Sequence, residues 1–169
     1  MTTAYKIGYE YPHDSWNIPP KLLIELHIPE YAITNIKRNN IVNPDTASYR
    51  SNIAYVKNIR NILNNKEHYM AESMYAINYT NNMFLYVVNR LIETYYDTNI
   101  NNECSNGIHF FLSKEVALQY ALFSIENGDL CTYYLNGAIK TKTSYKDGKL
   151  LSYYDYYHDG RIRGQSIVN

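Results

Sequence analysis

Three glycine-containing turns near the C-terminus constrain the fold of this chain more than any other feature. They are Asn136-Gly137, Asp147-Gly148 and Asp159-Gly160, and they recur at regular spacing. Asn-Gly and Asp-Gly provide the positive φ angles that two-residue hairpin turns require. The sequence therefore predicts a four-stranded antiparallel β-meander over residues 130–169. Its strands are expected at 130–135, 138–145, 149–157 and 161–168.

A central segment predicts a turn, a buried strand and then a helix. Gly107 permits a tight turn that a residue with a Cβ atom would resist. Residues 108–112 form a short apolar run, which is typical of an interior strand. Ser113 is a favourable N-cap, and Glu115 follows in the first turn, where the helix dipole favours negative charge. We therefore expect a helix at 113–124.

Hydrophobic alternation predicts further strands in the preceding part of the chain. Residues 21–28 alternate with a period of two, which buries one face of a strand. The residues of that face are Leu22, Ile24, Leu26 and Ile28. Residues 1–20 read as irregular, a helical turn is possible at 30–38, and a short helix is preferred at 67–77. Strands are also expected at 51–59, 84–88 and 91–94, with a kink or tight turn at Asn89-Arg90.

Together these elements predict an α+β protein. It would have a mixed, mostly antiparallel sheet with one main helix at about 113–124 and a C-terminal antiparallel β-meander. The length of 169 residues suits one domain, or one domain with an appendage. We expect a core domain at 1–129, and a meander at 130–169 that packs on or extends the core sheet.

Charge and cysteine content narrow the classes of function. The chain has 16 basic and 16 acidic residues, and this balance gives no general attraction to nucleic acid or anionic membrane. No stretch approaches the roughly 18 apolar residues of a membrane span, and the N-terminus lacks the apolar core of a secretory signal. Two separated cysteines, Cys104 and Cys131, then favour a reducing compartment. A soluble intracellular protein is expected.

Tyrosine is unusually frequent, with 20 among the 169 residues. Codons for Tyr, Asn, Ile and Lys are rich in A and T, so an AT-rich genome accounts for much of this frequency. Tyrosine also favours interfaces, because its ring is apolar while its hydroxyl stays hydrated. We expect the meander to contact a protein partner or a second copy of the chain. Its candidate binding residues are Tyr133, Tyr153, Tyr156, Arg161 and Arg163.

The same strands offer an alternative function, the binding of nucleic acid. Tyrosines interleaved with a basic stripe would suit a single strand, whose bases stack on aromatic rings. Lysines on strand edges also simply deter aggregation, and this interpretation is preferred. The stripe consists of Lys140, Lys142, Lys146, Lys149, Arg161 and Arg163.

One central cluster could carry chemistry. His109 would act as a base or an orienting group, with Glu115 or Tyr120 nearby. The structural alternative is preferred, because a histidine between Ile108 and Phe110 is usually half-buried and hydrogen-bonded. Metal binding by His109 with the two cysteines would lack the paired spacing of zinc sites. No phosphate-binding loop or hydrolase motif is present, so neither a cofactor nor a metal is expected.

Two features resemble uncharacterised proteins of giant DNA viruses of the mimivirus type. Residues 104–111 match a C-x-x-G-I-H-F-F signature, and the L-x-I-P at 26–29 and Y-R-x-x-x-A-x-V at 49–56 are similar to segments of the same proteins. Residues 145–150 and 157–162 resemble variant MORN repeats. The resemblance covers residues 21–169 and is weaker at 60–83. It implies no activity or catalytic residue, while MORN-type repeats imply protein or lipid contact.

One segment is faintly similar to the G-I-Y-F…S-K-S…Y segment of ADP-ribosyltransferases. It consists of Gly107-Ile108-His109-Phe110 with the following Ser113 and Tyr120. The similarity implies a strand and helix beside a nicotinamide pocket, although the other motifs of that family are not found. A divergent transferase with His109 in a cleft is therefore an alternative. The preferred prediction is a non-catalytic interaction or structural protein of a large DNA virus, in the host cytoplasm or the virion.

Overall fold

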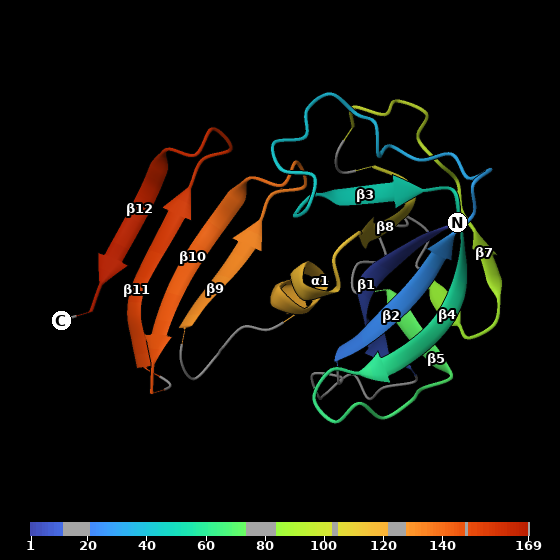
Figure 1. The fold of residues 1–169 in the computed structure, drawn as a ribbon, viewed down its shortest axis with the longest axis horizontal. Coiled ribbons are helices and arrows are strands. Elements are labelled where there is room, and N and C mark those ends of the chain that lie inside the picture. Colours follow the sequence, from blue (N-terminus) through green and yellow to red (C-terminus); the bar gives the residue numbers. More distant parts are fainter. Residues whose placement is uncertain (12–20, 74–83, 103–104, 122–127, 148, 169) are drawn as a thin grey trace.

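The protein is predominantly β in the computed structural model, which describes residues 1–11, 21–73, 84–102, 105–121, 128–147 and 149–168. Among these residues, twelve strands accompany one helix of eight residues, α1 (Lys114–Ala121). The strands form a larger and a smaller sheet, and α1 lies between them (Figure 1). The predicted α+β class is therefore wrong, because segments expected to be irregular or helical join the larger sheet.

The larger sheet has eight strands and the smaller sheet has four. The larger contains β1 (Thr2–Glu10), β2 (Lys21–Ile28), β3 (Ser48–Ser51), β4 (Ile53–Asn61), β5 (Met70–Ser73), β6 (Leu85–Val87), β7 (Leu91–Glu93) and β8 (Ile108–Phe111). The smaller contains β9 (Gly128–Tyr133), β10 (Ile139–Lys146), β11 (Lys149–Tyr156) and β12 (Ile162–Ile167).

The larger sheet is curled (Figure 1), and its strand pairing branches at β1, where β8 and β5 pair with the same edge. Its main path runs β3-β8-β1-β2-β4-β7, while β5 pairs with both β1 and β6. A tight turn joins β6 to β7 at Asn89, whose φ is 62°. The turn predicted at Asn89-Arg90 is confirmed, although the strands beside it pair with β5 and β4 rather than with each other.

Strand β1 is the main departure from the prediction that residues 1–20 are irregular. It pairs with β2 from Thr2 to Tyr9 and with β5 and β8 on its other edge, so it lies inside the sheet. The interior face of β1 carries Lys6 and Gly8 beside Ala4, which hides the alternation that usually reveals a strand. Residues 12–20 lie outside the described part of the chain.

The helix preferred at 67–77 is also wrong where the structure describes it, because Met70–Ser73 is strand β5. Ala71 of this strand is fully buried against the curled sheet, and such tertiary contacts override a weak helical preference. At 30–38 the chain makes turns, in which the Ala32 N–H bonds the Pro29 carbonyl and the Arg38 N–H bonds the Asn35 carbonyl, at 3.1 Å each. Strand β3 precedes the strand that was predicted at 51–59.

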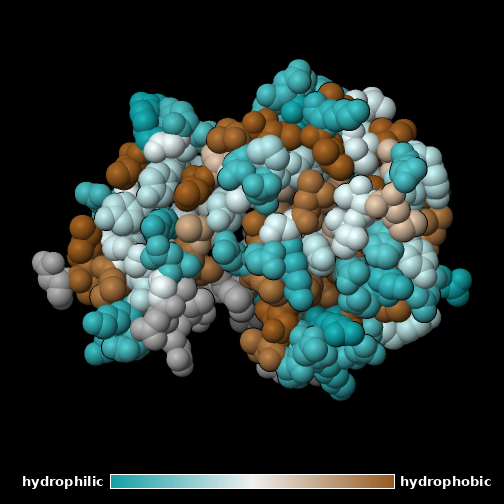
Figure 2. Space-filling view, viewed as in Figure 1, coloured by the Kyte–Doolittle hydropathy of each residue, from teal (hydrophilic) through white to brown (hydrophobic). Residues whose placement is uncertain are grey.

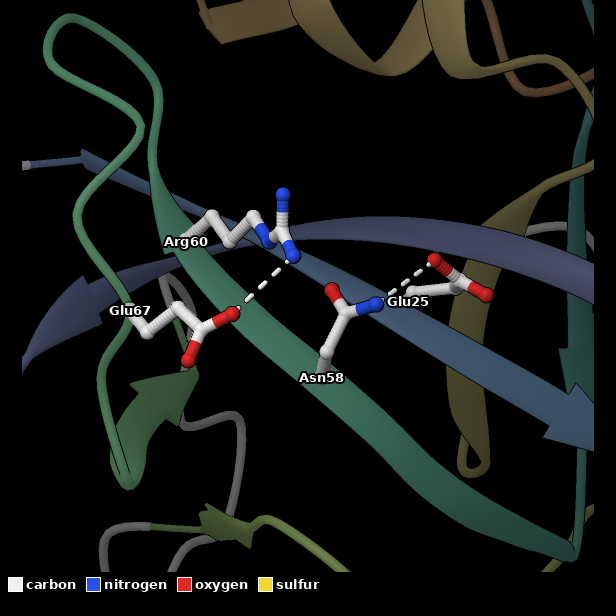
Figure 3. A network of polar contacts seen from close by, with 4 residues as sticks. All are labelled: Glu25, Asn58, Arg60 and Glu67. Atoms are coloured by element: carbon white, nitrogen blue, oxygen red, sulfur yellow. Dashed lines mark hydrogen bonds and ion pairs between the residues drawn. The ribbon is translucent and has the colours of Figure 1, made fainter.

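The predicted strand at 21–28 is confirmed as β2, and its even-numbered apolar residues enter the core. Ile24, Leu26, Val56 and Ile59 pack inside the curl. The opposite face of β2 and β4 carries polar residues beside Leu23, which packs against the smaller apolar cluster. On that face the Asn58 amide donates to Glu25 at 2.8 Å, and Arg60 pairs with Glu67 at 3.0 Å (Figure 3). The core therefore lies within the larger sheet.

Helix α1 covers a second, smaller apolar cluster beside β1 and β8. Ala117 and Ala121 of α1 pack with Ile7 of β1. The Val116 N–H donates to the Ser113 hydroxyl at 3.3 Å, which confirms Ser113 as the N-cap. The helix begins one residue after the predicted start, and residues 122–124 lie outside the described part of the chain.

The predicted meander is confirmed. The smaller sheet has the order β12-β11-β10-β9, and every neighbouring pair is antiparallel. Its three turns contain Gly137, Asp147 and Gly160, with φ angles of 87°, 50° and 83°. The local turn chemistry that predicted these hairpins therefore also forms them.

Candidate interaction surface

The first hairpin of the smaller sheet is held against a loop of the larger sheet. The backbone of Leu135 accepts a hydrogen bond from the Ser48 N–H at 3.2 Å, and Asn136 accepts one from the Val42 N–H at 2.7 Å. The Thr46 hydroxyl donates to the Gly137 carbonyl at 2.7 Å. These bonds join segments about ninety residues apart, so the smaller sheet has a defined position on the core.

Arg38 lies at the centre of this junction. It is buried, and its guanidinium donates to the Ser48 carbonyl at 2.7 Å and to the Leu135 carbonyl. The guanidinium also lies over the Tyr49 ring, 5.3 Å from its centroid. One arginine therefore ties the loop, strand β3 and the first hairpin together.

Helix α1 gives the smaller sheet a second support through Tyr133, one of the predicted binding residues. The Tyr133 hydroxyl donates to the Gln119 side-chain oxygen at 3.2 Å. Burial is the main cause that raises the pKa of Tyr133. This tyrosine therefore contacts the helix of its own chain.

Away from this junction, the smaller sheet is a single layer. None of the described residues of β10, β11 and β12 is buried. Figure 2 shows hydrophobic residues interspersed with hydrophilic ones over this part of the surface. The large hydrophobic or aromatic side chains that are exposed on the sheet and its turns include Ile139, Leu150, Leu151, Tyr153, Tyr157, Ile162 and Ile167. Most sheets bury at least one face, so this one exposes unusual apolar area.

The strand register assigns the candidate tyrosines to two faces. Lys142 of β10 is opposite Cys131 on one side and Tyr154 on the other, so these three residues share a face. Tyr133 and Tyr156 lie two residues beyond Cys131 and Tyr154, and they share that face. Tyr153 points to the opposite face. The structure thus separates Tyr153 from the other two tyrosines.

Three of the six residues of the basic stripe lie beside acidic side chains. Arg161 pairs with Asp159 at 2.8 Å, and its guanidinium lies over the Tyr157 ring at 5.5 Å. Arg163 lies 3.7 Å from Asp155, and Lys142 lies 2.8 Å from Asp129. Pairing within the chain leaves less positive charge for phosphate groups.

His109 has a structural position in β8. Its Nε2 lies 2.8 Å from the Ser105 carbonyl oxygen, which only accepts hydrogen bonds, so Nε2 carries the proton. Desolvation, together with the positive charges of Lys6 and Arg50, lowers the pKa of His109 to about 4. A general base works best with a pKa near the ambient pH, and a value of 4 does not favour that role.

The other two residues of the proposed chemical cluster have separate contacts. Glu115 accepts a hydrogen bond from the Ser113 hydroxyl at 3.0 Å at the start of α1. Tyr120 packs against Phe111, with ring centroids 5.5 Å apart. The hydrogen bond of Glu115 and the ring contact of Tyr120 thus involve Ser113 and Phe111 rather than His109. Cys104 of the proposed metal set lies outside the described residues.

Arg50, like Arg38, is a buried arginine that no local pattern in the sequence singled out. Its side chain is fully buried, and it donates to the carbonyl oxygens of Asn106 at 2.6 Å and Asn99 at 3.1 Å. The guanidinium lies over the Tyr96 ring, 5.0 Å from the centroid. Arg50 therefore holds the loop that leads into β8 and His109, and its place in the Y-R-x-x-x-A-x-V segment was the available signal.

The described residues contain neither a cluster of metal ligands nor a helix that could span a membrane. No group of three or more His, Cys, Asp or Glu side chains in these ranges could hold a metal ion. No helix in the same part of the chain is long and apolar enough to cross a membrane.

Comparison with known proteins gives one family and one relative of unknown function. A family described as a family of unknown function (DUF5758) matches residues 1–117. Uncharacterized protein L223 of Acanthamoeba polyphaga mimivirus is 32% identical over 114 residues, which are 64% of this chain and 66% of that protein. No solved structure matches the chain. The family match contains the larger sheet and ends before β9, so it does not extend to the meander or its MORN-like segments.

Proposed function

The chain belongs to this family of unknown function, and we propose that it is a non-catalytic protein-interaction module of a large DNA virus. The mimivirus relative supports a viral origin. In this proposal the curled sheet is the scaffold and the smaller sheet is the binding surface. The protein would act in the cytoplasm of the infected cell or in the virion.

One observation carries the proposal: the described residues of β10 to β12 include no buried side chain, although several are large and apolar. A folded chain normally covers such residues with another layer. Here the first hairpin is held firmly by Arg38 and by the backbone of Ser48, so the sheet projects in a defined orientation. A partner protein would supply the missing layer.

The two alternatives receive less support. For a transferase, His109 would need contact with a reacting group, whereas its hydrogen bond is to its own loop. For nucleic-acid binding, Arg161 and Arg163 would need free charge, whereas each lies beside an aspartate. Binding through the apolar side chains of the sheet requires neither condition.

Site-specific photo-crosslinking in the cells that naturally make the protein tests this function. A photoreactive phenylalanine analogue replaces Tyr153 on the smaller sheet, or Tyr69, which directly precedes β5, as a matched control. Both tyrosines are exposed, 37% and 65% respectively, so accessibility does not favour the test position. We expect a discrete crosslinked protein from position 153 and none from position 69. Equal crosslinking at both positions, or none at 153, would contradict the proposal.

A further inference from the structure

Strand β12 has a backbone edge that no strand of the described residues covers. It is the last strand in the order β12-β11-β10-β9 and pairs with β11 alone. An open edge of this kind presents unpaired N–H and C=O groups that can pair with another strand. The residues of β12 whose backbone groups point outward determine which strand fits this edge.

Two backbone hydrogen bonds show which residues of β12 direct their N–H and C=O groups outward, away from β11. The Val168 N–H donates to the Leu151 carbonyl at 2.8 Å, and the Tyr157 N–H donates to the Arg161 carbonyl at 2.8 Å. Each bond lies next to an opposed pair, Ser152–Ile167 or Tyr156–Ile162. In an antiparallel sheet, such a bond flanks a non-hydrogen-bonded pair of opposed residues. The backbone N–H and C=O groups of each residue in that pair point away from the strand of the other residue. Ile162 and Ile167 therefore point theirs outward.

Gln165 has the same orientation, because it lies two residues before Ile167 and is opposite Tyr154. The register shifts between Asp155 and Tyr156, and this bulge adds Arg163 to β12. Because the bulge adds one residue, the three-residue step from Gln165 back to Ile162 spans two positions of the neighbouring strand, from Tyr154 to Tyr156. The step from Gln165 forward to Ile167 also spans two positions, from Tyr154 to Ser152. The outward residues of β12 are thus symmetric about Gln165.

We propose that β12 pairs antiparallel with β12 of a second copy of this chain, about a two-fold axis at Gln165. This inference rests on the proposed function and names the partner for one edge of the binding sheet. Gln165 lies opposite Gln165 of the second copy, and Ile162 lies opposite the second copy's Ile167 on both sides of the axis. The two smaller sheets then form one continuous sheet of eight strands.

Charge and hydrophobicity favour this occupant. Antiparallel pairing brings the basic end of β12, Arg161 and Arg163, beside the uncharged end at Ser166–Val168 of the second copy. Like charges are therefore not opposed across the new ladder. Ile162 and Ile167 are 53% and 61% exposed in the single chain, and the pairing covers both. The balanced total charge adds no long-range repulsion between copies.

A charge placed on the axis tests the pairing. Gln165→Glu puts two carboxylates opposite each other, whereas Ser166→Glu adds the same charge next to the partner's basic end. Sedimentation velocity of the full chain over a range of concentrations measures the association. We expect the wild type and Ser166→Glu to dimerise, and Gln165→Glu to dimerise about tenfold more weakly at pH 7. A wild type that stays monomeric, or equal dimerisation of the two variants, overturns the proposal.

A disulfide test identifies the register and remains informative if a charged variant misfolds. In a Cys104→Ser, Cys131→Ser background, Gln165→Cys should form a disulfide-linked dimer on mild oxidation, because opposed residues lie about 5.5 Å apart. Ser166→Cys is the control and should form little. Equal crosslinking of both variants contradicts the register. If Tyr153 still crosslinks to a different protein while β12 does not self-pair, the proposed function stands and this inference fails.

Discussion

Gly137 lies against the backbone of Asn43 so closely that a Cβ atom at position 137 would collide with the Asn43 carbonyl oxygen. The φ of Gly137 is 87°, a value that L-residues with side chains rarely adopt. Both constraints occur in the hairpin that attaches the smaller sheet to the larger one. This contact adds to the hydrogen bonds of Arg38, Ser48 and Thr46 that hold the first hairpin on the core.

The first prediction concerns this contact. Gly137→Ala should lower the free energy of unfolding by about 3 kcal/mol, because backbone strain adds to the collision with Asn43. Gly160→Ala is the matched control: its φ is also positive, at 83°, but its added Cβ would meet no atom within 4 Å. It should cost about 1 kcal/mol. Urea unfolding measures both values, and equal losses would show that contact with Asn43 does not matter.

The second prediction concerns Arg50. Arg50→Lys removes the planar fork that reaches several carbonyl oxygens and leaves a buried charge poorly satisfied, so it should destabilise by about 3 kcal/mol. Hydrogen exchange should become faster at residues 97–102 and 105–106. Arg60→Lys is the control, since the Arg60–Glu67 pair is partly exposed and should change stability by less than about 1 kcal/mol. Unchanged exchange in the loop would refute the role of Arg50.

The third prediction concerns pH and His109. Its pKa is lowered to about 4 in the folded protein, below the unfolded value of about 6.5, so between these values the unfolded chain binds more protons. The folded state is therefore favoured fully above pH 6.5, and stability falls as the pH drops towards 4. His109→Gln should remove about 2 kcal/mol of this pH dependence. Chemical unfolding at pH 7.5 and 4.5 measures it, with His158→Gln as the control. Identical pH dependence in wild type and His109→Gln would contradict the pKa.

The fourth prediction concerns Lys6 on the interior side of β1. Desolvation lowers the pKa of Lys6 to about 8, and its Nζ lies 5.7 Å from the Tyr86 ring centroid. At pH 7 the lysine is still mostly charged, so its burial opposes folding. Lys6→Met keeps the length of the side chain without the charge and should stabilise the protein by about 1 kcal/mol at pH 7. The gain should shrink as the pH rises through 8 towards 10.5, because the folded lysine then loses its proton first. Thermal unfolding at pH 7 and 9.5 measures this, and a destabilised variant would show that the charge has a favourable partner.

The local signals in this sequence predicted the elements that depend on local chemistry. The turns at Gly137, Asp147 and Gly160 need positive φ, and the residues there supply it, so the meander was predictable. The alternation at Lys21–Ile28 and the Ser113 hydroxyl likewise predicted β2 and the start of α1. A half-buried, hydrogen-bonded His109 was expected and is found.

Other features arise from contacts between distant segments. The pattern of β1 includes Lys6 and Gly8, and the segment becomes a strand because β2, β5 and β8 provide backbone partners on both edges. The burial of Arg38 and Arg50 follows from carbonyl oxygens far along the chain, which no local pattern encodes. Sequence alone thus determined where the chain turns and which short runs alternate. Tertiary structure decided which runs pair, because pairing energy depends on neighbours that only the folded chain brings together.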